Sequence, residues 1–314
     1  MAPSTVSRTF ARPGRVNAET AARVRKVAEE LGYRANPISQ GHAVTASKML
    51  AVVVSDIANP FYSTLVRGTQ VAAAEAGYEI VLVDARESGN RERSALTRLL
   101  PMVEGVVIGG SRMPDAALRT IAKQKPTVVL NRELRDIPSV IPDNAGGMRA
   151  AIDLLRGFGH DQVVYVAGPE ASWQDGMRSR AIRDFAAAAG MQATRIGPFL
   201  PTVEGGLPAA RHLHNKRPPA VIVFNALMAS GVVRGLLDSG VRIPADISVL
   251  GCDDILTAQL VTPSLTTVAM PIRQIGITGV NNLAAIINGA KPSGGEALVL
   301  PVKLKVRRST GPRA

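Results

Sequence analysis

The sequence predicts an α/β protein made of two lobes of related design, preceded by a small all-helical head. From Leu50 onward, short β-branched runs alternate with longer helical stretches, a pattern typical of parallel sheets covered by helices on both faces. Seven runs are predicted strands: LAVVVSD (50–56), EIVLVDA (79–85), GVVIGG (105–110), TVVLN (127–131), VVYVAG (163–168), AVIVFN (220–225) and ISVLGCD (247–253).

Two helices with similar endings indicate a weak internal repeat. TLVRGTQVAAAEAGY (64–78) and MRSRAIRDFAAAAGM (177–191) have helical patterns, and they are expected to stop at Gly77 and Gly190. Each helix follows an apolar strand and a polar or proline-containing loop, and each leads into another extended run. The two units cover about residues 50–85 and 163–199, one for each lobe.

Polar residues gather at the carboxyl ends of the predicted strands. Ligands of open parallel sheets bind beyond these ends, so two lobes that face each other there form a binding cleft. The residues at these positions are Asp56, Asn131, Arg132, Asp143, Asn225 and Asp253.

The first 46 residues have a different pattern. NAETAARVRKVAEELGY (17–33) predicts an amphipathic helix that begins at the N-cap residue Asn17 and ends at Gly32. Its expected apolar stripe consists of Val24, Val27, Ala28 and Leu31. RANPISQGHAVTAS (34–47) follows, and we interpret it as a linker or a marginal helix.

Composition narrows the class of protein. The apolar fraction of 46 % allows a large core, and the net charge of +12 favours a polyanionic partner or a solvated basic surface. The charge is concentrated at the ends: residues 1–48 carry eight cations against three anions, and residues 303–314 carry five cations. Cys252 is the only cysteine, and no apolar run approaches the roughly 18 residues of a membrane span. We therefore expect a soluble cytoplasmic protein without a membrane partner.

The sequence argues against an enzyme. The four histidines form no HExxH arrangement, and His212 and His214 are two positions apart, so they do not share a helix face for a metal. The glycine pairs 109–110 and 146–147 match neither phosphate-loop nor dinucleotide fingerprints. We expect no catalysis, no metal and no cofactor.

Several stretches together resemble the lactose-repressor/galactose-repressor family of bacterial transcription regulators. They occur in the family's order and cover almost the whole chain: STVSRTF, RVNAETAARVRKVAEELGYRANPI, VVSDIANPFYSTLVRGTQVAAAEAGY, VIPDNAGGMRAAIDLLRGFGH, VVYVAGPEASW, VRIPADISVLGCDD, PSLTTVAMP and LPVKLKVRRST. The resemblance implies a helix-turn-helix head and hinge over 1–46 and a periplasmic-binding-protein-like sensor over 47–314. Lobe 1 is expected at about 49–144 and 271–289, and lobe 2 at about 145–267 and 297–308.

The resemblance also assigns DNA-binding roles in the head. Pro3, Ser4 and Arg8 match residues that face base edges, and Thr5, Ser7 and Asn17 match residues that touch phosphate or cap a helix. Similar proteins begin about 20 residues earlier with a supporting first helix, so we expect the chain as given to lack that helix. A start codon placed too late and a true loss of the helix both remain open.

The hinge departs from the family pattern at one position. His42 stands where many relatives place a leucine that wedges into the minor groove. The histidine either enters the groove or is part of a solvated linker, and a strong central kink of the DNA is not expected.

In the sensor, the resemblance implies a small ligand bound between the lobes. Arg178 and Asp253 match an arginine and an aspartate that bind ligand oxygens, and such a pair suits vicinal hydroxyls; a structural ion pair is the alternative. Further candidates are aromatic stacking residues or polar residues at the cleft edge: Phe61, Tyr62, Asp143, Trp173 and Asn225. Phe61 and Tyr62 have an alternative role in hydrophobic packing at the start of a helix, and Asp143 in capping the helix that begins near Ala145. Arg132 is a weaker candidate. Ala226 replaces the family's usual aspartate, a change in either ligand polarity or a helix cap.

The predicted function is a DNA-binding transcription regulator whose operator affinity is controlled by a small effector, a sugar or sugar derivative. Most similar proteins repress, so the resemblance favours a repressor. The expected partners are double-stranded operator DNA, the effector and a second copy, in a homodimer or a tetramer. A sugar-binding transport protein would share the sensor fold, but it should carry a signal peptide and no basic head. The alternative is a cytoplasmic sugar sensor that does not grip DNA.

Overall fold

The computed structural model describes residues 5–6, 9, 14, 16–30, 47–291 and 296–313. The chain divides into two units, Met1–Ser47 and Lys48–Ala314. Among the described helices, none is both long enough and apolar enough to cross a membrane.

The head contains helix α2 (Ala18–Glu30), which begins at the predicted N-cap. Asn17 Oδ1 accepts a hydrogen bond from the Glu19 backbone N–H at 2.9 Å. Ala21 and Val24 are buried, whereas Val27 is 46 % exposed. The expected apolar stripe is therefore wrong at Val27, because the buried face runs through Ala21 and Val24 instead. Leu31 lies outside the described residues.

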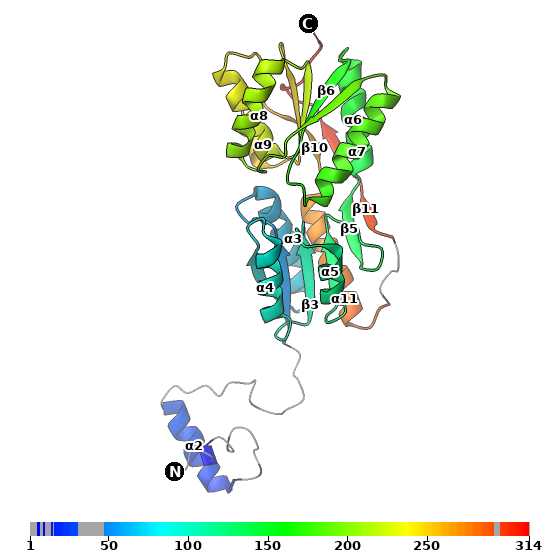
Figure 1. Ribbon diagram of the computed structural model, residues 1–314. Helices are drawn as coiled ribbons and strands as arrows, with labels where there is room; N and C mark the ends of the chain where they lie inside the picture. Colours follow the sequence, from blue (N-terminus) through cyan, green and yellow to red (C-terminus); the bar gives the residue numbers. More distant parts are fainter. Residues whose placement is uncertain are drawn as a thin grey trace. The chain divides into compact units, whose positions relative to one another are not determined.

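Residues 48–314 form two α/β lobes, each built on a six-stranded sheet (Figure 1). The first sheet has the order β11-β5-β4-β3-β1-β2, and its described strands pair in parallel. Its strands are β1 (Met49–Val54), β2 (Glu79–Asp84), β3 (Gly105–Gly109), β4 (Thr127–Leu130), β5 (Ser139–Pro142) and β11 (Leu298–Leu300). Its helices are α3 (Pro60–Glu75), α4 (Gly89–Leu99), α5 (Asp115–Ala122) and α11 (Ile272–Ile287).

The second sheet has the order β12-β10-β9-β8-β6-β7, with β12 antiparallel to β10. Its strands are β6 (Gln162–Val166), β7 (Gln192–Ile196), β8 (Ala220–Val223), β9 (Ser248–Cys252), β10 (Thr266–Ala269) and β12 (Lys303–Lys305). Its helices are α6 (Asn144–Gly157), α7 (Trp173–Ala188), α8 (Val203–Lys216), α9 (Ala226–Asp238) and α10 (Leu256–Leu260). Helices α6 and α7 pack together, as do α8 and α9 on the other side of the sheet (Figure 1).

In the first lobe, side chains of successive strand residues point to opposite faces of the sheet, and both faces are covered by helices. Val52 and Val54 of β1 face the layer of α3 and α11, whereas Ala51 and Val53 face the layer of α4 and α5. All four residues are at most 1 % exposed, which is why the strand is apolar throughout. At the ends of α3 and α7, Gly77 (φ +75°) and Gly190 (φ +71°) have left-handed conformations, as predicted.

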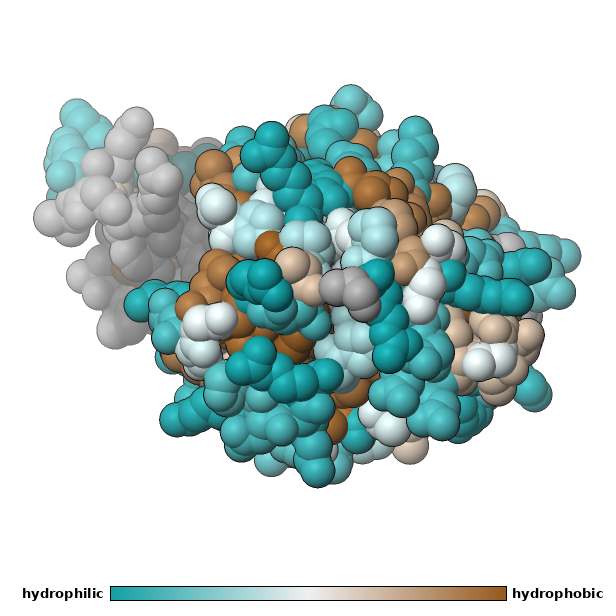
Figure 2. Space-filling model, turned by 90° about the horizontal axis from the view of Figure 1, so that it is seen from above, coloured by the Kyte–Doolittle hydropathy of each residue, from teal (hydrophilic) through white to brown (hydrophobic). Residues whose placement is uncertain are grey.

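The last crossing of the chain between the lobes lies at a different place from the expected one. We expected residues 297–308 in lobe 2, but β11 pairs with β5 in the first sheet. The crossing therefore falls after Leu300, and β12 then pairs with β10 in the second sheet. Seen from the end of the second lobe, the surface is mostly hydrophilic and is interrupted by apolar patches (Figure 2).

Candidate ligand-binding site

A cleft lies between the two lobes, at the carboxyl ends of strands from both sheets. It is lined by residues of both lobes, and six of the seven predicted ligand-binding residues are among them: Phe61, Tyr62, Trp173, Arg178, Asn225 and Asp253. The structure therefore brings together residues that lie up to 192 positions apart in the sequence.

Arg178 lies at the floor of this cleft and is only 2 % exposed. It belongs to α7, which begins at the N-cap Ser172, whose hydroxyl accepts from the Asp175 backbone N–H at 3.4 Å. The Arg178 guanidinium donates to the Phe224 carbonyl and to Asn144 Oδ1, the latter at 3.3 Å. These bonds fix the guanidinium before any ligand arrives.

Asp253 faces Arg178 but is not hydrogen-bonded to it, because Arg178 Nη2 lies 3.6 Å from Asp253 Oδ1. The Asp253 side chain is buried, and its Oδ1 accepts no hydrogen bond from the described part of the chain. Burial raises the pKa of the carboxyl to about 6, although the charge of Arg178 lowers it. At neutral pH the carboxylate is therefore mostly ionised and available to a donor group of a ligand.

Aromatic side chains flank the cleft from both lobes. Phe61 and Tyr62 open α3, where Asn59 Oδ1 accepts from the Phe61 backbone N–H at 3.0 Å and Pro60 occupies the first turn. Their rings meet edge to face, with centroids 5.0 Å apart. Burial raises the pKa of the Tyr62 phenol, so it remains a neutral hydroxyl. Trp173 begins α7 on the opposite lobe. Such rings suit the C–H face of a sugar.

Asp143 is not among the residues that line this cleft, so its role in the ligand site stays a prediction. Its Oδ1 accepts from the Gly146 backbone N–H at 2.8 Å and caps α6. An aspartate directly before a helix satisfies an otherwise unpaired backbone N–H, and this interaction holds the carboxylate at the helix end. Asp56, two residues after the end of β1, is also absent from the cleft lining; its Oδ1 accepts from the Ala58 backbone N–H at 3.0 Å.

The departure at Ala226 leaves the helix cap intact. Asn225 supplies the cap of α9, because its Oδ1 accepts from the Met228 backbone N–H at 2.8 Å. Its Nδ2 donates to the Pro201 carbonyl at 3.0 Å. The absent carboxylate at position 226 therefore changes the polarity of the region rather than the cap.

A direct bond between the lobes was not predicted. Gln174 of α7 donates to the backbone oxygen and to Oδ1 of Asn131, at 2.9 and 2.8 Å. Both residues are buried, and Gln174 Oε1 accepts no hydrogen bond from a described residue. Gln174 lies four positions before Arg178, so the helical repeat places both on one face of α7, a signal that could have identified it.

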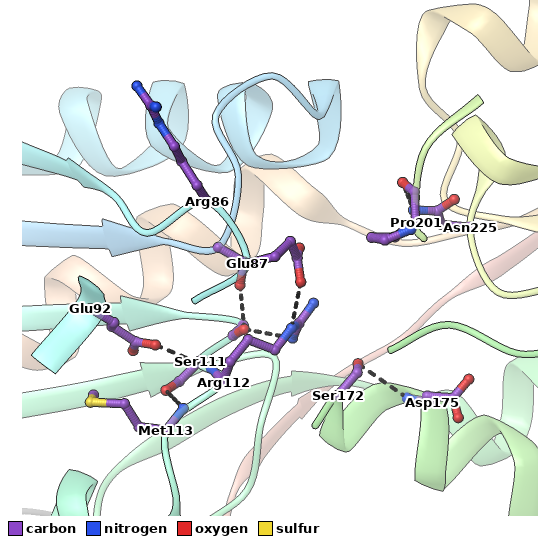
Figure 3. A network of polar contacts seen from close by, with 12 residues as sticks. Arg86, Glu87, Glu92, Ser111, Arg112, Met113, Ser172, Asp175, Pro201 and Asn225 are labelled. Carbon is purple, nitrogen blue, oxygen red and sulfur yellow. Dashed lines mark hydrogen bonds and ion pairs between the residues drawn. The ribbon is translucent and has the colours of Figure 1, made fainter. Parts of the chain in front are cut away.

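A charged pair on the wall of the first lobe was also missed. Arg112 Nε lies 2.6 Å from Glu87 Oε2, and both residues line the cleft (Figure 3). Arg112 comes three residues after the last residue of β3, so its position beyond a predicted strand end was the available signal. Arg132 lines the cleft too, but it is tied to the Met113 carbonyl at 2.7 Å and to Asp115.

The described residues test few of the head predictions. Thr5 is half-buried, and its carbonyl accepts from the Thr9 hydroxyl at 2.9 Å, as in one turn of helix. Asn17 caps α2. The other predicted DNA-binding residues lie outside the described residues: Pro3, Ser4, Ser7, Arg8 and His42.

A two-lobed α/β sensor with a polar interlobe cleft, preceded by a basic helical head, defines the class of ligand-regulated DNA-binding proteins. Residues 152–310 match the family described as periplasmic binding protein-like domain, and residues 2–36 match bacterial regulatory proteins, lacI family. The HTH-type transcriptional repressor CytR of Escherichia coli (strain K12) is 30 % identical over 318 residues, covering 98 % of this chain and 92 % of that protein.

Solved structures agree with this assignment. The lac repressor dimer bound to operator and the anti-inducer ONPF has a TM-score of 0.77 and 27 % identity, over 98 % of this chain and 95 % of that one. The complex of the transcriptional regulator CelR with cellobiose has a TM-score of 0.76 and 29 % identity, over 98 % and 96 %. The chain belongs to the lacI family of bacterial regulatory proteins. It is a regulator and not an enzyme.

Proposed function

We propose that this protein is a transcription regulator that acts as a repressor. It binds operator DNA through residues 1–46 and a sugar or sugar derivative in the interlobe cleft. The main support for a sugar effector is the buried Arg178–Asp253 pair. Asp253 Oδ1 accepts no hydrogen bond from the described residues. A ligand hydroxyl satisfies this oxygen, whereas without a ligand the oxygen is buried and has, within the described part of the chain, only the ion pair with Arg178 at 3.6 Å. The cellobiose bound by the similar regulator CelR supports the same ligand class.

The proposed mechanism is a population shift between open and closed sensors. A ligand that contacts Asp253 on one lobe and Tyr62 on the other favours closure, and Gln174 already joins the lobes directly. Closure turns the first lobe against its dimer mate and alters the spacing of the two hinges. Operator affinity and effector affinity are then coupled through the same movement.

A homodimer, or a tetramer made from two dimers, is the proposed assembly. The short helix α10 exposes two large leucines, Leu256 at 65 % and Leu260 at 70 %. Apolar side chains that gather on an exposed helix indicate a protein interface. The lac repressor, which is similar over nearly the whole chain, is a dimer in its operator complex. We place the regulator in the cytoplasm, where it meets chromosomal DNA.

DNA binding by the full chain should weaken steeply with salt. Helix α2 exposes Arg23, Arg25 and Lys26, and the head carries an excess of cations. Each neutralised phosphate releases a counterion, so six or more phosphate contacts cost about 10³-fold in affinity between roughly 50 and 200 mM salt. Fluorescence anisotropy of a duplex enriched from a randomised library by this protein measures the slope.

Two arginine variants separate a base contact from a general effect of charge. Arg8→Ala removes the predicted base-reading side chain and should weaken the enriched duplex more than a scrambled duplex, by roughly 1–3 kcal/mol. Arg67→Ala is the control, because it removes the same charge from an exposed position on α3. A salt-independent affinity, or no enrichment of any duplex, would contradict DNA binding and favour a sensor that does not grip DNA.

A further inference from the structure

We propose that Glu87 and Arg112 form the first-lobe half of the effector site and select an effector whose edge facing that lobe carries adjacent hydroxyl groups and no negative charge. This inference rests on the proposed function, because it concerns the specificity of the same cleft. The pair is held in place by the chain, keeps unused hydrogen-bonding capacity and carries both a positive and a negative charge.

The pair is fixed in the wall of the cleft before ligand binding. Arg112 Nη1 donates to the Gly110 carbonyl at 2.7 Å, and its Nε lies 2.6 Å from Glu87 Oε2. The Arg112 side chain is 7 % exposed and that of Glu87 is 25 % exposed. Figure 3 shows both side chains at the open space across which Ser172, Pro201 and Asn225 of the second lobe lie.

The ion pair is not needed to hold the chain at this place. The Arg112 backbone N–H already donates to Glu92 Oε2 at 3.1 Å, and the Glu87 backbone N–H donates to the Ser55 carbonyl at 2.6 Å. A buried ion pair contributes little net stability, because desolvation offsets the attraction. A mainly structural role therefore explains the pair poorly.

The backbone is strained where Glu87 enters the cleft. Arg86 (φ +47°) and Glu87 (φ +57°) are two successive non-glycine residues in the left-handed region. Such conformations are strained for residues with a side chain, and they persist where they serve a site. Here they turn Glu87 toward Arg112, whereas Arg86 points away from the pair (Figure 3).

The remaining polar atoms define the ligand. Arg112 Nη2 donates to no residue that the structure describes, and only Oε2 of Glu87 is engaged there. A donor and an acceptor side by side match two adjacent hydroxyls, one accepting from Arg112 and the other donating to Glu87. A carboxylate or phosphate at this edge would be repelled by Glu87, and an apolar edge would leave Arg112 Nη2 and Glu87 Oε1 desolvated without a hydrogen bond.

The second lobe has complementary requirements. Asp253 Oδ1 and Gln174 Oε1 are buried acceptors without described donors. Each lobe thus presents an arginine–carboxylate pair to the cleft: Arg112 with Glu87, and Arg178 with Asp253. An effector with hydroxyls on opposite edges satisfies both pairs and so bridges the lobes.

The experiment compares neutral sugars with their acid counterparts on the full chain. Isothermal titration calorimetry would use D-glucose, D-galactose, D-ribose, D-xylose and cellobiose, together with the matched acids D-glucuronate and D-galacturonate. We expect a neutral sugar to bind and its uronate to bind at least tenfold more weakly. Glu87→Gln should weaken the neutral sugar by about tenfold and narrow or invert the preference over the uronate.

Two further variants separate the possible outcomes. Arg112→Gln should weaken the neutral sugar without any gain for the uronate, and Arg86→Gln, whose side chain is 72 % exposed, should change neither. Urea unfolding confirms that each variant is folded. Unchanged affinities in Glu87→Gln, together with a loss in Asp253→Asn, would overturn this inference and leave the proposed sugar effector standing. Binding of uronates in preference to neutral sugars would overturn this inference alone, because a uronate is still a sugar derivative, whereas binding of no sugar at all would overturn both.

Discussion

Asp253→Asn is expected to weaken binding of the best neutral sugar by roughly 10- to 100-fold, because it removes a charged acceptor from the floor of the cleft. The same change should not lower the free energy of unfolding at pH 7. The Asp253 carboxylate is buried without a described hydrogen-bond donor, so its ionised form is unfavourable in the unliganded fold. Calorimetric titration and urea unfolding measure the two quantities separately.

The pH dependence gives this prediction a second readout. The carboxyl pKa is raised by burial to about 6 from 3.8, so the folded state binds a proton before the unfolded state does. Asp253 therefore adds stability as pH falls from about 6 towards 4. Effector affinity should follow the opposite trend, since the ionised acceptor is lost, and should fall about tenfold per pH unit below pH 6. Both trends should be absent from Asp253→Asn.

Asp254→Asn is the matched control for this experiment. Asp254 is the next residue but lies outside the cleft lining, paired with Lys305 and Arg307 at 2.6 Å each. Burial alone would raise its pKa, but the hydrogen bonds from these two cations hold the pKa of Asp254 below its usual value. Its substitution should lower stability and leave effector affinity unchanged. The same pattern in Asp253→Asn would contradict a role in ligand binding.

Arg178→Met is expected to lower the free energy of unfolding by about 3–5 kcal/mol, because removing one partner leaves a buried carboxylate uncompensated. The Phe224 carbonyl and Asn144 Oδ1 lose their donor in the same step. Urea unfolding of the wild type and the variant at pH 7 measures the loss. Effector binding should disappear even under conditions in which the variant is folded.

Two comparisons distinguish this mechanism from a general effect of losing an arginine. Arg180→Met changes an exposed residue of the same helix and should alter stability by less than about 0.5 kcal/mol. Adding Asp253→Asn to Arg178→Met should restore part of the stability, because the uncompensated charge is removed. A loss in Arg178→Met no larger than that in Arg180→Met would show that the buried contacts do not support the fold.

The sequence predicted much of the sensor fold because its central strands β1, β3, β4, β8 and β9 are apolar and buried. The seven apolar runs are all strands, and the glycines at 77 and 190 end their helices. The short strands β5, β10, β11 and β12 have only three or four residues each, too few for a recognisable period. The crossing after Leu300 depends on which sheet edge is unpaired, and that is a tertiary property.

The site was predictable where a residue type and its position pointed to the same chemistry. Arg178 and Asp253 combine a matching motif with a place on the cleft floor. Asp143 also matches a family motif, but its carboxylate caps helix α6 and is not part of the cleft lining. Glu87 and Gln174 owe their positions to a left-handed turn and to a contact between lobes. Neither feature leaves a signal in a single sequence beyond the helical spacing of Gln174.

Control of DNA binding through the cleft is tested most directly by the affinity of the full chain for its enriched duplex, measured at fixed salt with and without a saturating neutral sugar. We expect the affinity for the duplex to change by roughly 5- to 150-fold in either direction when the sugar is present. We expect no such change in Asp253→Asn under the same conditions. Equal affinities with and without the sugar, in a protein that binds both the duplex and the sugar, would contradict a regulator controlled through this cleft.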